Sequence, residues 1–144
     1  MPLPAFGSVS TVGNLHETDT RWNRRRQACT PLDPNLNHSF DVHFFTAGAT
    51  DTYRFRADWD DSDALIDGFL HAFLANDTFD RTNPNLGTDG DGFPCLAGND
   101  DFGAVDVSQL DVFLISGETV AIIASSTFAA EDIGPYLLTA SLTP

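Results

Sequence analysis

With 144 residues and a net charge of −14, the chain is long enough to bury a core of its own and too acidic to attract nucleic acid or an anionic membrane. The charge comes from 18 aspartates and 3 glutamates against 7 arginines and no lysine, and aspartate favours turns over helices. Twelve phenylalanines among many Gly, Asp, Asn and Thr residues predict an all-β domain rich in turns. The longest apolar runs are too short for a transmembrane segment, and residues 1–10 lack the basic start and apolar stretch of a signal peptide.

The N-terminal part is predicted to be irregular. Residues 1–10, with two prolines and a glycine, indicate an extended arm, and residues 11–15 a first short strand. We therefore divide the chain into an arm with its strand at 1–19 and one sandwich domain at 20–144.

Four of the seven arginines lie in residues 20–26, around Trp22. We interpret this stretch as a loop whose guanidiniums stack on Trp22 and pair with the acidic surface. A basic binding patch is the alternative. Residues 27–38, with Pro31 and Pro34, also indicate a loop.

Two alternating runs follow. In residues 39–45, Phe40, Val42 and Phe44 share one face. Residues 52–59 give the clearest period of two in the chain and predict a strand with an aromatic inner face, formed by Tyr53, Phe55, Ala57 and Trp59.

The stretch 62–76 fits two structures. Its apolar residues make a helical stripe with Ser62 as N-cap, but Gly68 in the middle argues against a helix. A continuous apolar run also fits a strand buried on both faces, which we place at 69–74.

The rest of the chain is a long loop and three strands. Residues 79–103 are rich in glycine and aspartate and are predicted to be one long loop. Strands are predicted at 110–115, 119–125 and 136–143, the first two joined as a hairpin by residues 116–118. The whole predicts an antiparallel, jelly-roll-like sandwich of two sheets and about seven or eight strands.

The acidic part of this loop is a candidate calcium site. Carboxylates crowded among glycines need a cation to offset their repulsion, and calcium accepts six to eight oxygens in a flexible geometry. The spacing does not match an EF-hand, so a site built from two loops is expected, with an affinity on the order of 10⁻⁴ to 10⁻³ M. Its candidate ligands are Asn99, Asp100, Asp101, Asp89, Asp91 and Asp60. A solvated acidic loop and adaptation to high salt are the alternatives.

Other chemistry has less support. Cys29 and Cys95 would close a loop of about 67 residues if paired, contributing roughly 4 kcal/mol in the chain-entropy model. The four histidines are scattered, so no zinc site is predicted, and His43 and His71 are interpreted as packed within strands. No G-x-S-x-G motif occurs, and we predict that the chain is not an enzyme.

Three groups of residues resemble secreted bacterial β-sandwich modules related to the pre-peptidase C-terminal domain. They are Trp22-Asn23-Arg24, the centre Phe79-Asp80 with Asn83-Pro84 and Asn99-Asp100-Asp101-Phe102-Gly103, and the late Gly117 and Gly134-Pro135-Tyr136-Leu137-Leu138. Arg25 and Arg81 stand where these modules often have proline. The resemblance implies a non-catalytic extracellular sandwich, in some relatives binding calcium near the Asn-Asp-Asp loop, and it places 69–74 in a strand.

Together these observations predict an extracellular or cell-surface module with a structural role in a surface, filament or matrix assembly, stabilised by calcium. The N-terminal arm and the sheet edges would allow self-association by strand addition. The alternative is an accessory module that binds a carbohydrate or a protein through an exposed aromatic residue, with Trp22, Trp59 and Phe102 as candidates.

Overall fold

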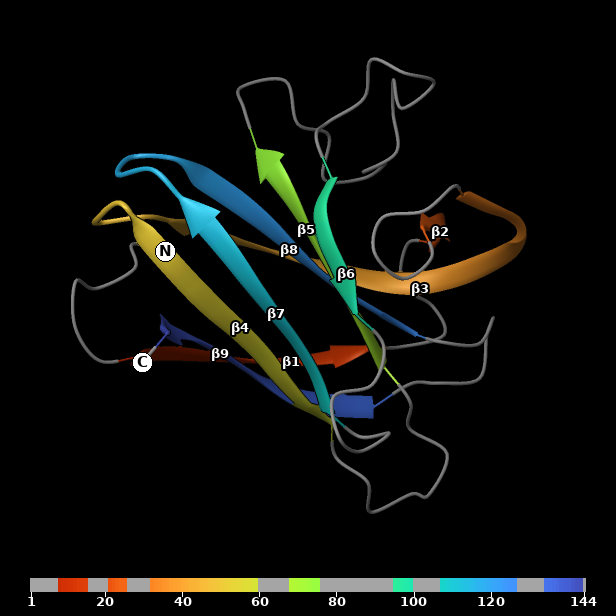
Figure 1. The fold of residues 1–144 in the computed structure, drawn as a ribbon. Helices are drawn as coiled ribbons and strands as arrows, with labels where there is room; N and C mark the ends of the chain where they lie inside the picture. The colour runs from red at the N-terminus through yellow and green to blue at the C-terminus, as the bar shows by residue number, and fades with distance from the viewer. Residues whose placement is uncertain are drawn as a thin grey trace.

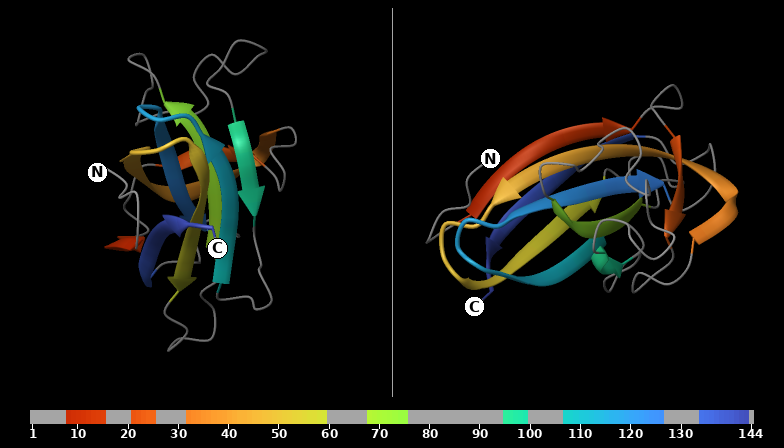
Figure 2. Two further views of the ribbon diagram at one scale, coloured as in Figure 1. Left: turned by 60° about the vertical axis from the view of Figure 1, so that its left-hand side comes forward. Right: turned by 90° about the horizontal axis from the view of Figure 1, so that it is seen from above.

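The computed structural model describes residues 8–15, 21–25, 32–59, 68–75, 95–99, 107–126 and 134–143. In these ranges the chain forms nine strands and no helix. The strands make two antiparallel sheets that face each other (Figure 1, Figure 2). The predicted all-β, two-sheet sandwich is confirmed, with β2 and β6 as strands that the sequence did not reveal.

One sheet has four strands and the other has five. The four-stranded sheet runs in the order β1 (Ser8–Leu15), β9 (Gly134–Leu142), β4 (Asp51–Trp59) and β7 (Val107–Leu114). The five-stranded sheet runs in the order β2 (Arg21–Arg25), β3 (Leu32–Thr46), β8 (Thr119–Ser126), β5 (Gly68–Ala75) and β6 (Cys95–Asn99).

The main core lies between the sheets, and β4 supplies much of it. Its alternation places Tyr53, Phe55, Ala57 and Trp59 inside and the intervening polar residues outside, as predicted. The rings of Phe45 and Phe55 meet across the two sheets, 5.3 Å between centroids. A period-two sequence therefore predicts this strand and its inner face correctly.

The central strands β5 and β8 of the five-stranded sheet are buried on both faces. Six consecutive residues from Gly68 to Phe73 are buried, so the continuous apolar run is a strand, as preferred over a helix. Leu70 and Ala72 face the main core, whereas Phe73 belongs to a second buried cluster on the outer face of this sheet, with Phe40, Ala121 and Ile123. The shared face predicted for Phe40, Val42 and Phe44 is this outer face.

Three regions predicted as loops contain strands. The arginine-rich stretch forms β2, and β3 begins at Leu32, inside the region interpreted as a loop because of its prolines. Pro34 is tolerated because it lies between the pairs Arg25–Leu32 and Asn23–Asn37, where the register shifts. Strand β6 interrupts the long loop and pairs with β5, also across a register shift. None of the three alternates in hydrophobicity, so only long-range backbone pairing defines them.

The predicted hairpin at residues 116–118 is wrong, because β7 and β8 belong to different sheets. The turn from Ile115 to Glu118 crosses between them, and Gly117 adopts the φ of +91° that such a turn needs. Residues 47–50, which connect β3 to β4, also cross between the sheets, and they bind this turn. Gly117 N–H donates to Ala47 O at 2.8 Å, and Ala47 N–H donates to Glu118 O at 2.8 Å.

Candidate functional site

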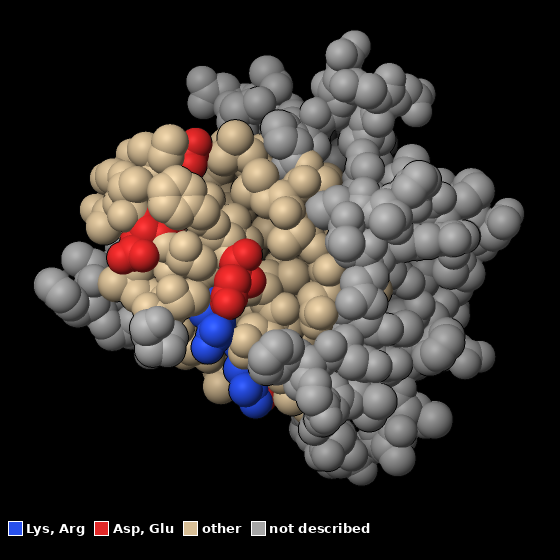
Figure 3. Space-filling view, viewed as in Figure 1, with Lys and Arg blue, Asp and Glu red and all other residues tan. Residues whose placement is uncertain are grey.

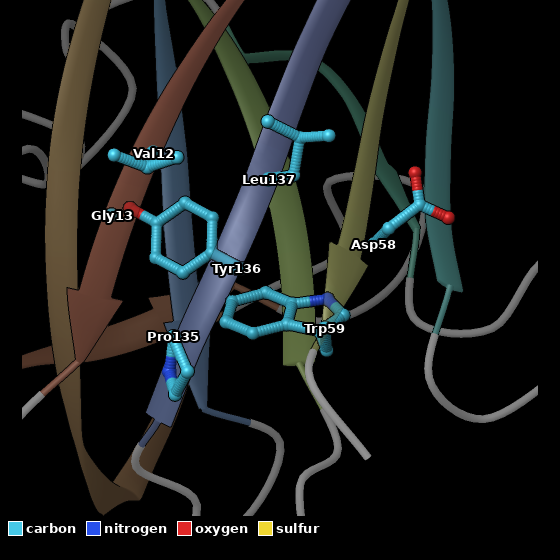
Figure 4. A pocket seen from close by; sticks show the side chains of 7 residues that line it. All are labelled: Val12, Gly13, Asp58, Trp59, Pro135, Tyr136 and Leu137. Carbon is cyan, nitrogen blue, oxygen red and sulfur yellow. The ribbon is translucent and has the colours of Figure 1, made fainter. Parts of the chain in front are cut away.

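An open hollow of about 280 Å³ lies on the four-stranded sheet, where β1, β9 and β4 run side by side (Figure 4). It is mainly apolar and includes one carboxylate. Its lining residues are Val12, Gly13, Asp58, Trp59, Pro135, Tyr136 and Leu137.

The rim of the hollow is a row of side chains across three strands. Leu137 on β9 lies opposite Val12 on β1 and opposite Asp58 on β4. Side chains paired in this way project to the same face, which here is the outer one. Val12 is 77% exposed and Leu137 41% exposed, so two apolar residues meet solvent side by side.

Two residues of the lining, Tyr136 and Trp59, belong to the inner face of the sheet, where their rings pack over glycines. Tyr136 and Trp59 are almost fully buried, with ring centroids 4.6 Å apart. A Cβ on Gly13 would overlap the Tyr136 ring, and one on Gly68 would overlap the Trp59 indole. Both glycines are therefore required by the close approach of a ring, and Gly68 also lets Trp59 reach across to the other sheet.

Tyr136 also connects the two sheets through a polar bridge. Its hydroxyl donates to Asp41 Oδ2 at 2.8 Å and lies 2.7 Å from His43 Nε2, both residues belonging to β3. Since the phenol has one proton and donates it to Asp41, its oxygen accepts from His43, which must carry a proton on Nε2. This bridge joins β9 to β3 at the side of the sandwich where β1 approaches β3.

A second connection between the sheets runs through Trp59. Its indole N–H donates to Ser108 Oγ at 3.3 Å, and the Ser108 hydroxyl donates to the Gly68 carbonyl at 3.0 Å. Because Ser108 is fully buried, these bonds satisfy polar atoms that would otherwise be costly to bury.

The charged groups beside the hollow are arranged in pairs. Arg54 binds Asp111 with two hydrogen bonds, of 2.9 and 3.0 Å, and Arg56 binds Asp58 at 2.9 Å. The hydrogen bond to Asp111 raises the pKa of the Arg54 guanidinium. In Figure 3 the described basic side chains lie beside acidic ones in the lower middle of the face, and other acidic side chains lie apart from them among uncharged residues. Such exposed pairs contribute little to stability, but they fix the orientation of Asp58.

Most of the predicted calcium ligands cannot be placed, since Asp60, Asp89, Asp91, Asp100 and Asp101 lie outside the described residues. Asn99 ends β6, and its side-chain oxygen accepts from the Gln109 N–H at 3.4 Å. No group of three or more His, Cys, Asp or Glu side chains that could hold a metal occurs within the described ranges. Calcium binding stays a prediction from the sequence.

The aromatic and cysteine predictions have different outcomes. Trp59 is 4% exposed and is a core residue, so it reaches the hollow by an edge and does not form an open platform. The Trp22 side chain and Phe102 lie outside what the structure describes. Cys95 is partly buried beside the outer-face cluster and is not a free thiol. Cys29 is outside the described residues, and its pairing with Cys95 stays a prediction.

Sequence reasoning missed the residues that form the bridge. Asp41 was one aspartate among 18, and His43 was interpreted only as a packed histidine, which is correct but incomplete. The alternation of residues 39–45 does place Asp41 and His43 on the face opposite Phe40, and this was the signal available. It could not show that this polar face points into the sandwich.

The overlap at Gly68 leads to a stability prediction. We expect Gly68→Ala to lower the free energy of unfolding by about 1–3 kcal/mol, because the added methyl forces the Trp59 indole out of its position. Urea unfolding followed by circular dichroism measures this loss. The double variant Gly68→Ala with Trp59→Phe should lose less than the sum of the two single variants, and additive losses would show that the two residues do not conflict.

No protein-family model and no curated protein matches this chain. Solved structures do match. The pre-peptidase C-terminal domain of a collagenase from Bacillus anthracis aligns over 98% of this chain and 91% of its own, with 10% identity and a TM-score of 0.52. The resemblance is one of fold. It confirms, at that level, the similarity inferred from the sequence motifs.

Two further structures align with lower scores. PliG, a periplasmic inhibitor of g-type lysozyme from Aeromonas hydrophila, shares 12% identity over 99% of this chain and 94% of its own, with a TM-score of 0.48. The mitogen YPM from Yersinia pseudotuberculosis shares 11% identity over 95% and 86%, with a TM-score of 0.44. Both scores are under 0.5, and we build no inference on them. The described residues include no helix of the length and apolarity needed to cross a membrane.

Proposed function

We propose that this chain is a non-catalytic accessory module of an extracellular protein and that it contacts a carbohydrate or protein ligand through the hollow on the four-stranded sheet. The observation that carries the proposal is the exposed row of Val12 and Leu137 beside Asp58 on the outer face of the sheet. Apolar walls with a few oriented polar groups are typical of binding sites. Asp58 is held by Arg56, and the strands below it are held by the buried rings of Trp59 and Tyr136, so a ligand would meet a surface that is already ordered.

A sugar ring is the ligand that we would test first. The hollow is open and of the order of a single ring in size, and its apolar surface suits the C–H face of a pyranose. Asp58 at its border has a partly exposed carboxylate that can accept a hydrogen bond from a sugar hydroxyl while remaining paired with Arg56. The collagenase domain with the same fold is itself one module of a larger protein, which supports an accessory role.

The test is a binding screen on a glycan array, followed by titration of the best ligand. We expect Leu137→Arg to abolish binding of that ligand, because the long charged side chain fills the hollow. Phe113→Arg is the matched control, since Phe113 is also exposed but lies on β7, the edge strand at the opposite end of the sheet from β1. If Leu137→Arg and Phe113→Arg bind the ligand equally well, the hollow is not the binding site. The proposal is also rejected if the wild-type protein binds nothing on the glycan array or on an equivalent peptide array.

A structural role in a surface, filament or matrix assembly is a second proposal. It is supported by β1, an edge strand that pairs with β9 alone among the described strands. Sedimentation velocity over a wide concentration range tests for self-association, and a monomer at every concentration would contradict a homopolymer.

Calcium stabilisation is proposed on the sequence alone, for the acidic segment around Asn99, Asp100 and Asp101. We expect millimolar calcium to raise the melting temperature and a chelator to reverse the rise, since an ion that binds only the folded state stabilises it. Magnesium at equal concentration is the control because it requires a tighter octahedral site. The same rise with both ions would indicate general charge screening of an acidic chain.

A further inference from the structure

We propose that β1 is a docking edge for an extended, positively charged peptide segment of another protein, which adds to the four-stranded sheet as a fifth strand. This proposal does not depend on the ligand of the hollow, although the two sites are neighbours. It follows from a comparison of the four sheet edges that the structure describes and from the charge of the chain.

The first argument is that β1 has none of the features by which an edge strand avoids pairing. Charged residues, prolines, short length and bulges protect edges. Strand β1 has the sequence SVSTVGNL, without charge or proline, and all eight residues pair with β9 in one unbroken register. Alternate backbone N–H and C=O groups of such a strand point away from β9, its only partner among the described strands.

The other three edges are protected. Strand β2 has five residues, three of them arginines, and its register with β3 shifts. Strand β6 also has only five residues and a register shift. Strand β7 carries the charged residue Asp111, held by Arg54. Only β1, of the four described edges, is at once long, regular and uncharged.

The second argument concerns the side chains that an added strand would meet. A residue placed opposite Val12 would extend the row that runs through Leu137 to Asp58. Val12 leaves 77% of its surface in solvent, so an apolar side chain beside it would cover surface that no described residue covers. The exposed Ser10 and Asn14 on the same face of β1 leave room for small or polar neighbours.

The third argument selects the partner. A second copy would bring the same net charge of −14 to the edge, and the two would repel each other. A strand with lysine or arginine at alternate positions is attracted by the same field, and its arrival is accelerated. An uncharged edge on a strongly acidic protein therefore fits a basic extended segment better than it fits another copy of this chain.

The test uses synthetic eight-residue peptides and fluorescence anisotropy at moderate salt. The probe alternates lysine with valine, and the control peptide alternates lysine with proline, which keeps the charge but cannot form a strand. We expect the lysine–valine peptide to bind the wild-type protein at least about tenfold more tightly than the lysine–proline peptide, because only the former can use the backbone of β1.

Two protein variants locate the site. Val12→Lys puts a charge on the edge and should weaken binding of the lysine–valine peptide by about tenfold or more. Phe113→Lys adds the same charge to β7 at another exposed position and should leave the affinity unchanged. If Val12→Lys does not fold, Ser10→Lys on the same face replaces it. Equal binding of the two peptides, or equal effects of the two variants, would overturn the proposal. Dimerisation of the wild-type protein that Val12→Lys abolishes would assign the edge to a second copy and also overturn it.

Discussion

Replacing Tyr136 with alanine is expected to lower the free energy of unfolding by about 3–5 kcal/mol, the loss typical of a large aromatic residue removed from a core. Tyr136 is 3% exposed, packs on Trp59 and covers Gly13, so its ring leaves a space that strands on either side cannot close. Its hydroxyl is also the centre of the bridge to Asp41 and His43. Equilibrium unfolding in urea measures the loss, provided that the wild-type protein and the alanine variant each unfold in one transition.

Tyr136→Phe separates the ring from the hydroxyl. It keeps the packing and removes both hydrogen bonds, so we expect a loss of about 1–3 kcal/mol, because Asp41 and His43 each lose one hydrogen bond to the phenol. The nitrogen resonances of His43 should shift in Tyr136→Phe, which a purely packing effect would not explain. A phenylalanine variant as stable as the wild-type protein would show that the bridge contributes nothing to holding β9 against β3.

Breaking the proposed disulfide between Cys29 and Cys95 is expected to cost about 4 kcal/mol, from the chain entropy of a loop of about 67 residues. Cys95 begins β6, which among the described strands pairs with β5 alone, at the edge of its sheet. A bond at this point would therefore tie down an edge strand that has five residues and an irregular register. The free energy of unfolding is measured with and without reductant.

Serine variants test the pairing itself. If the two cysteines are bonded, Cys29→Ser, Cys95→Ser and the double variant should be equally destabilised, because either single change already removes the bond. Reductant should then destabilise the wild-type protein and leave all three variants unchanged. Two small, additive losses would show that the cysteines are not paired.

The sequence predicted strands well wherever the pattern of apolar residues reflects the environment of the two faces of the strand. The alternation in β4 follows directly from its two environments, and the continuous apolar run in β5 follows from burial on both faces. It failed at β2, β6 and the start of β3, where prolines, arginines or a lack of alternation hide the strand. These segments are extended because a neighbouring backbone pairs with them, and side-chain periodicity does not report such pairing.

The candidate site was less predictable than the fold. Val12, Asp58 and Leu137 are far apart in the sequence and form a row only through the register of β1, β9 and β4. Likewise, the short turn at Gly117 resembles a hairpin locally, yet it crosses between sheets because the Ala47 backbone binds it from the other crossover. The predicted aromatic contact, Trp59, was correctly recognised as an inward-facing residue of its strand, and that position leaves only its edge at the hollow.

Composition and local pattern by themselves determined that this chain is an acidic all-β sandwich, since turn-forming residues, aromatic residues and period-two runs act over a few positions. The tertiary structure alone decided which strands are neighbours, which edge is left unprotected and which polar residues join the two sheets. The physical reason is that pairing partners and sheet edges depend on contacts between residues far apart in the chain, such as Gly13 with Tyr136 and Gly68 with Trp59.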